Sequence, residues 1–257
     1  MVATTQISPE LRGLLQSAQD CETTGDYAQA FRLLQRCAAL LDPTADTQLA
    51  PSIKAGLWRL DPLWWANIQH GGIRLRRSQA GDADFFRRCF GDAAFRRQFN
   101  RRQPWQGDLA LALDKAGRQP PIDTGLLMWV VQSGAGSPIG LASLSSIDTL
   151  NRKAELSVGF PGDVPVKLGI KTTVMMLHFA LVMMPFNKVY GYVYEDNAQA
   201  LHNATRLGFS HEGTLVDHFN IPGQGFLSVN QIGLTRTQLH GHAGLKVLAK
   251  RLIGQDW

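Results

Sequence analysis

One stretch of the chain, from Glu155 to Gly213, constrains the fold more strongly than any other. Residues 154–160 predict a strand, residues 161–171 predict a loop, and the largely apolar residues 172–184 predict a buried helix. We prefer a helix there because strands rarely run past about ten residues. A strand–loop–helix unit of this kind directs backbone N–H groups and a helix dipole towards an anion, typically a phosphate.

The second half of this stretch continues the alternation of strand and helix. Residues 187–195 are aromatic and β-branched with nearly alternating polarity, which predicts a strand. Residues 196–209 begin with Asp196 and Asn197, which favour helix starts, and end near Gly208, a common helix stop. The stretch therefore predicts a strand, a helix, a second strand and a second helix in that order.

Three motifs in this order resemble one known family. The LGFxxEG run at residues 207–213, preceded by a helix and Asn197, resembles the closing motif of GNAT-fold N-acyltransferases. Residues 136–160 resemble the central hairpin of the RimJ/RimL-type branch, and residues 73–90 resemble its opening strand and helix. The resemblance covers about residues 73–239. It implies an α+β fold, with a central mixed, mostly antiparallel twisted sheet flanked by helices, and acetyl-CoA as the donor of an acyl group to an amine.

The resemblance also implies where the chemistry takes place. Backbone N–H groups of the strand Leu156–Phe160, Val158 included, would hold the donor and stabilise charge on the thioester oxygen, and Gly159 would allow close approach. Glu155 precedes this strand and could take the proton of the attacking amine, directly or through water. The alternative role for Glu155 is a structural hydrogen bond or a salt bridge, for instance to Arg152.

The predicted loop before the apolar helix departs from the family pattern for pyrophosphate binding. That pattern is Arg or Gln, two residues, then Gly-x-Gly/Ala, and the matching positions here are Val166, Gly169 and Lys171. Only Gly169 fits, so Lys171 could either supply charge to the phosphates or block the loop. The candidate donor-binding residues in this region are Lys167, Leu168, Gly169, Lys171 and Thr172.

The proton for the leaving thiol has no obvious source. Many GNAT enzymes carry a tyrosine four residues before the Gly of the LGF motif, where this chain has Ala204. A thiol with a pKa of about 8.5 can leave without such help. Asn197 either bonds the cofactor arm, as the resemblance implies, or only caps its helix. The other candidate proton donors are His202 on the donor side, His218 on the acceptor side, Tyr192 and Tyr194.

The basic excess of the chain lies between residues 73 and 105. This segment contains nine arginines and three aspartates, a local charge of +6, whereas the whole chain carries +5. In GNAT-fold enzymes the helices here wall the acceptor site. Arg96, Arg97 and Arg101 are therefore candidate ligands of an acidic, amine-bearing acceptor, because the guanidinium fork matches carboxylates and phosphates. The alternative is a solvated helix face; nucleic acid is not expected, since no basic–aromatic interleaving is present.

The flanking segments predict further parts of the chain. Residues 1–45 predict a helical hairpin that resembles a single tetratricopeptide repeat, which cannot bury its own apolar face. The hairpin either docks on its own catalytic domain or recruits a protein partner or a second subunit. Residues 46–72 predict a tryptophan-rich connection that begins as a loop, and its tryptophans either pack the hairpin on the domain or stack on a substrate. Residues 73–239 predict the GNAT domain, and residues 240–257 predict a C-terminal helix.

Cysteine usage and hydropathy set the expected environment. The chain has three cysteines without metal-ligand spacing, which predicts reduced thiols and no metal site. The N-terminus lacks a signal pattern, and the apolar run 172–186 is short for a bilayer span. We therefore expect a cytoplasmic protein that does not cross a membrane.

Two functions of different kinds fit these features. The first is an acyl-CoA-dependent N-acyltransferase whose acceptor is an acidic small molecule, an amino-sugar nucleotide or a protein N-terminus. The second is a GNAT-fold binding module that has lost its donor and uses the helical hairpin as a contact surface. Donor binding distinguishes the two.

Overall fold

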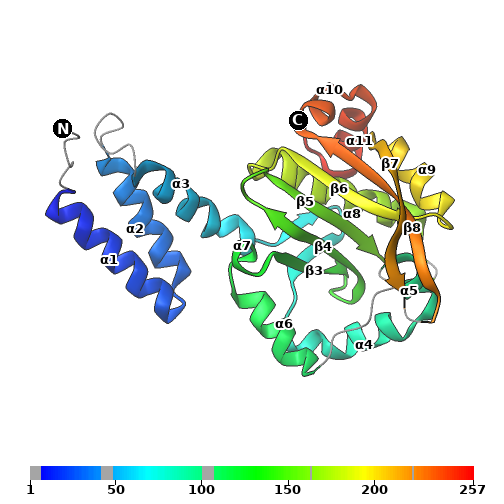
Figure 1. Cartoon of the computed structure of the whole chain (residues 1–257), viewed down its shortest axis with the longest axis horizontal. Coiled ribbons are helices and arrows are strands. Elements are labelled where there is room, and N and C mark those ends of the chain that lie inside the picture. The colour runs from blue at the N-terminus through cyan, green and yellow to red at the C-terminus, as the bar shows by residue number, and fades with distance from the viewer. Residues whose placement is uncertain (1–6, 42–48, 100–106, 163, 222) are drawn as a thin grey trace. The chain divides into compact units, whose positions relative to one another are not determined.

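The computed structural model describes residues 7–41, 49–99, 107–162, 164–221 and 223–257. The chain forms two compact units, Met1–Ala66 and Asn67–Trp257 (Figure 1).

The N-terminal unit is a helical hairpin with a third helix. The hairpin turns at Gly25, which has a positive φ of 80°, and Asp26 caps the second helix by accepting a hydrogen bond from the Gln29 N–H. The elements are α1 (Pro9–Thr24), α2 (Tyr27–Leu40), α3 (Leu49–Arg59) and the 3-10 turn η1 (Pro62–Trp65). The sequence predicted a loop where α3 begins, but Ile53 of α3 joins the apolar core of the hairpin, and this burial stabilises the helix.

The tryptophans of the connecting segment are used within this unit. The Trp64 indole N–H donates to the Trp58 carbonyl at 2.7 Å, and the Trp65 ring stacks on Tyr27 with centroids 5.7 Å apart. Part of the apolar face that one hairpin cannot bury is therefore covered by the segment that follows it.

The second unit is organised around one eight-stranded sheet. Its order is β1-β2-β3-β4-β5-β6-β8-β7, and every described neighbour is antiparallel except the β5–β6 pair. The strands are β1 (Ile68–His70), β2 (Ile73–Arg77), β3 (Leu126–Ser133), β4 (Pro138–Asp148), β5 (Lys153–Gly159), β6 (Lys188–Tyr194), β7 (Ser210–Ile221) and β8 (Gly225–Thr235). The predicted mixed, mostly antiparallel sheet is confirmed.

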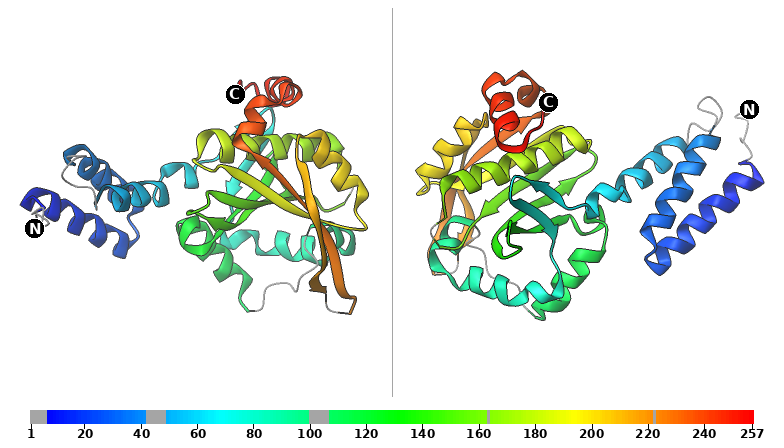
Figure 2. Two further views of the ribbon diagram at one scale, coloured as in Figure 1. Left: turned by 45° about the horizontal axis from the view of Figure 1, so that its top comes forward. Right: turned by 180° about the vertical axis from the view of Figure 1, so that it is seen from behind.

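Helices cover both faces of this sheet, as Figure 2 shows. On one face, Met128 and Val130 of β3 pack in a core with Phe86 and Phe95. On the other face, Trp129 meets Phe179 edge-on, with ring centroids 5.2 Å apart. The helical elements are η2 (Ala80–Asp82), α4 (Ala83–Gly91), α5 (Ala93–Phe99), α6 (Leu109–Arg118), α7 (Pro121–Thr124), α8 (Val166–His178), the π-helical turn η3 (Phe179–Met183), α9 (Ala198–Arg206), α10 (Arg236–Gly241) and α11 (Ala243–Ile253).

Three boundaries differ from the sequence prediction. Helix α8 begins at Val166, directly after Pro165, so most of the predicted loop 161–171 is helical. The local pattern predicts a strand at residues 215–220, but β7 begins earlier, at Ser210. The predicted C-terminal helix, residues 240–257, is found as the shorter α11, and α10 is a separate helix that precedes it. In α8 and β7, burial or strand pairing extends the element through residues whose local pattern is weak.

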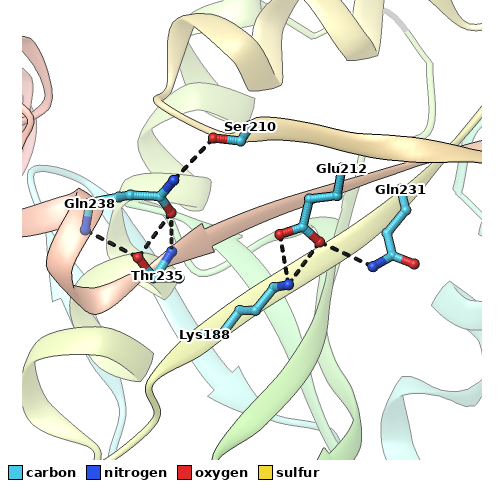
Figure 3. A network of polar contacts seen from close by, with 6 residues as sticks. All are labelled: Lys188, Ser210, Glu212, Gln231, Thr235 and Gln238. Atoms are coloured by element: carbon cyan, nitrogen blue, oxygen red, sulfur yellow. Dashed lines mark hydrogen bonds and ion pairs between the residues drawn. The ribbon is translucent and has the colours of Figure 1, made fainter.

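Polar contacts around Glu212 explain the early start of β7 (Figure 3). Glu212 accepts hydrogen bonds from Lys188 of β6 at 2.7 Å and from Gln231 of β8 at 3.0 Å. Burial raises the pKa of Glu212, but these two hydrogen bonds outweigh it and lower the pKa overall. Gln238 of α10 also donates to Ser210 at 3.1 Å. The glutamate of the LGFxxEG motif therefore ties β7 to β6 and β8.

Among the described residues, one helical segment, Val166–Met183, could cross a membrane by length and composition alone. Half of it is buried within this protein, and core helices of soluble domains pass the same test. Its Phe179 packs on Trp129 of the sheet.

Candidate active site

The parallel strands β5 and β6 pair over only three residues each. Residues 153–155 of β5 pair with residues 188–190 of β6, whereas β5 continues to pair with β4 as far as Gly159. The strands separate beyond this point, and backbone groups on the far edge of β5 face the gap. A Cβ atom at Gly191 would lie 3.2 Å from the Leu156 carbonyl oxygen, so the start of the gap suits a glycine.

A cavity of about 450 Å³ occupies this gap. Residues 156–160 of β5 and residues 191–193 of β6 form two of its walls, and α8 and α9 contribute the others. Most of the residues that line it are apolar, and about half of the exposed lining surface is polar, a mixture that is typical of a pocket for a small molecule or a cofactor arm. The apolar lining residues include Phe99, Leu156, Val158, Phe160, Ile170, Leu207 and Phe209.

One end of the cavity lies at the start of α8. Gly162, Val164, Pro165 and Val166 line it there. The first-turn N–H groups of a helix have no intrahelical acceptor, and the helix dipole adds positive character. The arrangement suits a ligand with an apolar arm and an anionic group.

The strand residues predicted for catalysis and donor binding come together here. Leu156, Val158, Gly159 and Phe160 all line the cavity. At Gly159 an added Cβ would lie 2.5 Å from Cδ2 of Phe99, so a side chain there would disturb the cavity wall.

Glu155 lies beside the cavity but does not line it. Alternation along β5 places Glu155 on the same sheet face as Ser157, which does line the cavity. Glu155 pairs across the strands with Tyr190. Burial raises the pKa of Tyr190, and the negative charge of Glu155 raises it further. Glu155 is therefore one strand step from the gap, on the face covered by α4, α5 and α6.

The residues predicted for the pyrophosphate loop are divided by the helix that contains them. Gly169 lines the cavity together with Val166, Ile170 and Thr173, because positions three, four and seven apart share one helix face. This periodicity turns the other four candidates, Lys167, Leu168, Lys171 and Thr172, away from the cavity wall.

Lys171 and Thr172 are buried elsewhere. The Lys171 ammonium donates to the Gly71 carbonyl at 2.7 Å, and burial lowers the pKa of this lysine. The Thr172 side chain is fully buried. The expectation that Lys171 either holds or blocks the phosphates does not match this position, because its charged end is used in a contact with the β1–β2 turn.

The predicted residues of α9 are also separated. Asn197 caps α9 by accepting a hydrogen bond from the Ala200 N–H at 3.1 Å, and lines a second hollow of about 440 Å³ beside α5. His202 is exposed and does not line the main cavity, whereas Asn203 and Ala204 do.

One of the three arginines predicted to bind an acidic acceptor is paired within the protein. Arg97 pairs with Asp196 at 3.0 Å, and Arg96 is exposed on α5. Arg101 lies outside the described residues. Nearby, Arg76 makes a two-pronged ion pair with Asp82. Part of the local positive charge is thus compensated within the fold.

His218 lies on β7, next to the site. Its ring centroid is 5.3 Å from that of Tyr192, which lines the cavity. Thr173, Asn203 and Phe99 also line the cavity, although no sequence pattern singled them out. A helix assigned from residue 166 would have shown Thr173 on the face of Gly169, but nothing in the local pattern places Phe99 near Gly159.

The fold and the cavity define an α+β acyltransferase-type domain with a cofactor-sized slot between two separated strands. The GNAT acetyltransferase domain family matches residues 73–210, more than half of the chain. The chain belongs to this family, which uses acetyl-CoA as the acetyl donor, so the predicted enzyme class and donor are confirmed at the level of the family.

The chain is similar to spermidine N(1)-acetyltransferases from two bacteria. The protein from Escherichia coli (strain K12) is 30% identical over 90 residues, which are 35% of this chain and 48% of the relative. The protein from Vibrio cholerae is 29% identical over 97 residues, which are 37% of this chain and 56% of the relative. The chain thus spans about half the length of the curated relatives it matches.

Solved structures with the same fold include spermidine N-acetyltransferase from Vibrio cholerae in complex with CoA and spermine. The identity is 22%, the TM-score is 0.56, and the match covers 65% of this chain and 97% of that chain. A dodecameric structure of the Vibrio cholerae enzyme matches with 22% identity and a TM-score of 0.53, over 65% of this chain and 95% of that chain. These likenesses show the fold.

Proposed function

We propose that this protein transfers an acetyl group from acetyl-CoA to a primary amine. The observation that carries the proposal is the cavity in the gap between β5 and β6, which ends at the start of α8. The pantetheine arm would lie along the free edge of β5, and the pyrophosphate would lie at the first turn of α8. In this arrangement Glu155 would receive the amine proton, and N–H groups of residues 156–160 would stabilise the oxyanion.

For the acceptor, we propose a polyamine-like primary amine as the first class to examine. The named relatives act on spermidine, and one related structure contains spermine. A polyamine is cationic, whereas the acidic acceptor expected from the sequence has no support from these names. The fold also weakens the acidic expectation, because Arg97 is paired with Asp196. Amino-sugar nucleotides and protein N-termini remain alternatives with the same reacting group.

Donor binding by the wild-type protein tests the proposal. We expect calorimetry to show saturable binding of acetyl-CoA, with a dissociation constant of about 1 mM or tighter. A thiol-release assay should then show turnover with spermidine that exceeds turnover with an amino-sugar nucleotide or a peptide N-terminus. If about 1 mM acetyl-CoA produces neither heat nor saturation, the transferase function is wrong and the binding-module alternative is favoured.

The remaining sequence-based assignments are also proposals. We propose membership of the RimJ/RimL-type branch, a cytoplasmic location, and a division into residues 1–45, 46–72, 73–239 and 240–257. We also propose that the hairpin, which resembles a tetratricopeptide repeat, binds a protein partner or a second copy of the chain. Light scattering on the full chain and on a variant without residues 1–66 would test self-association. If both proteins form particles with the same number of chains, the hairpin is excluded as the cause of self-association.

A further inference from the structure

A thioester transfer releases a thiolate, and a proton donor beside the sulfur assists its departure. Within the described part of the chain, the polar side chains that line the cavity are Gln98, Ser157, Thr173, Tyr192 and Asn203. Of these, only the tyrosine titrates in a range that suits an acid for a thiolate.

Tyr192 occupies a defined place at the gap. It follows Gly191, where β6 has just separated from β5. Alternation along the strand puts the Tyr192 ring on the sheet face that faces α5, the same face as Ser157 on the opposite wall. The Phe219 ring meets the Tyr192 ring edge-on, with centroids 5.6 Å apart, and the Tyr190 ring meets it with centroids 5.8 Å apart. These aromatic neighbours hold the ring beside the cavity.

The other proton donors considered from the sequence are less well placed. His202 is exposed on α9 and does not line the cavity. Tyr194 is buried in a cluster with Ile221 and Val229, away from the lining. His218 does not line the cavity, although its ring lies beside the lining residue Tyr192, with ring centroids 5.3 Å apart. Ala204 lines the cavity but has no proton to give.

We propose that Tyr192 is the catalytic acid of this site. The inference rests on the proposed acetyl transfer. The amine lone pair attacks the thioester carbon, a C–N bond forms, and the C–S bond breaks with its electron pair on sulfur. The Tyr192 hydroxyl gives its proton to that sulfur, so CoA leaves as the thiol. The surplus proton on nitrogen passes to Glu155 or water, and the phenolate is reprotonated from solvent.

The test compares Tyr192→Phe with the wild type. Phenylalanine keeps the ring contacts with Phe219, so thermal unfolding should be nearly unchanged. We expect kcat to fall about tenfold or more, while the acetyl-CoA dissociation constant stays within about twofold, as for loss of a general acid. The alkaline decline of kcat that reports ionisation of the phenol should disappear. Tyr194→Phe, on the same strand but outside the cavity, is the matched control and should keep wild-type kcat.

A second readout does not need turnover. A hydrogen bond from Tyr192 to the sulfur would stabilise the thiolate of bound CoA and lower its pKa. Ultraviolet titration of the CoA complex should therefore show a higher thiol pKa in Tyr192→Phe than in the wild type. An unchanged thiol pKa together with wild-type kcat and pH profile would overturn the role of Tyr192 but leave the acetyl transfer intact. A wild type that does not bind CoA would instead remove the proposed function itself.

Discussion

Replacing Glu155 with glutamine is expected to lower kcat by about ten- to a thousandfold, the range lost with a general base or an amine anchor. Glutamine has nearly the same size but cannot accept a proton at neutral pH. Glu155 lies one strand step before the gap, on the face of Ser157. It does not line the donor cavity, so the acetyl-CoA dissociation constant should change by less than about twofold. Stopped assays of thiol release and calorimetry measure the two quantities.

Two further variants separate chemistry from structure at this position. Glu155→Asp keeps the carboxylate and should recover part of the lost rate, whereas a purely structural role would make it as poor as glutamine. Glu195→Gln removes an exposed carboxylate directly after the end of β6 and should leave kcat unchanged. Wild-type turnover in Glu155→Gln, once an acceptor is established, would exclude Glu155 from the mechanism.

Replacing Lys171 with alanine is expected to lower stability without weakening donor binding. The Lys171 ammonium donates to the Gly71 carbonyl at 2.7 Å and is buried, so alanine leaves that carbonyl without its donor. Such a loss costs about 1–3 kcal/mol of unfolding free energy. Urea denaturation should detect it, and Lys246→Ala, an exposed lysine on α11, should change stability by less than about 0.5 kcal/mol. An acetyl-CoA affinity that changes more than threefold in Lys171→Ala would instead return Lys171 to the phosphate site.

The same lysine predicts the sign of a pH effect. Burial lowers the pKa of Lys171 from 10.5, and the charge of Lys167 lowers it further. Between the lowered pKa and 10.5 the unfolded chain binds more protons than the folded one, so this group makes stability rise with pH in that window. Lys171→Met keeps the hydrocarbon packing and should lose this rise. When both proteins are melted at several pH values across this window, the stability of the wild type should rise relative to that of Lys171→Met. Stability curves that stay parallel would contradict the prediction.

Much of the site could be predicted from short-range patterns. The alternation of strand and helix from Glu155 to Gly213 and the LGFxxEG motif indicated the GNAT fold, because hydrophobic periodicity and turn residues are local properties of the chain. The family resemblance implied a donor beside residues 156–160, and these residues do line the cavity.

Tertiary structure decided the rest. Burial against the sheet and the β1–β2 turn makes residues 166–171 helical, and the helical period then turns Lys171 away from the cavity while Thr173 faces it. The place of Tyr192 depends on the separation of β5 from β6, which involves strands more than thirty residues apart and leaves no mark in the local sequence. Sequence alone therefore predicted the family and the strand that lines one wall of the cavity. Which side chains meet at the gap was determined by packing, because only long-range contacts set the register of strands and the rotation of helices.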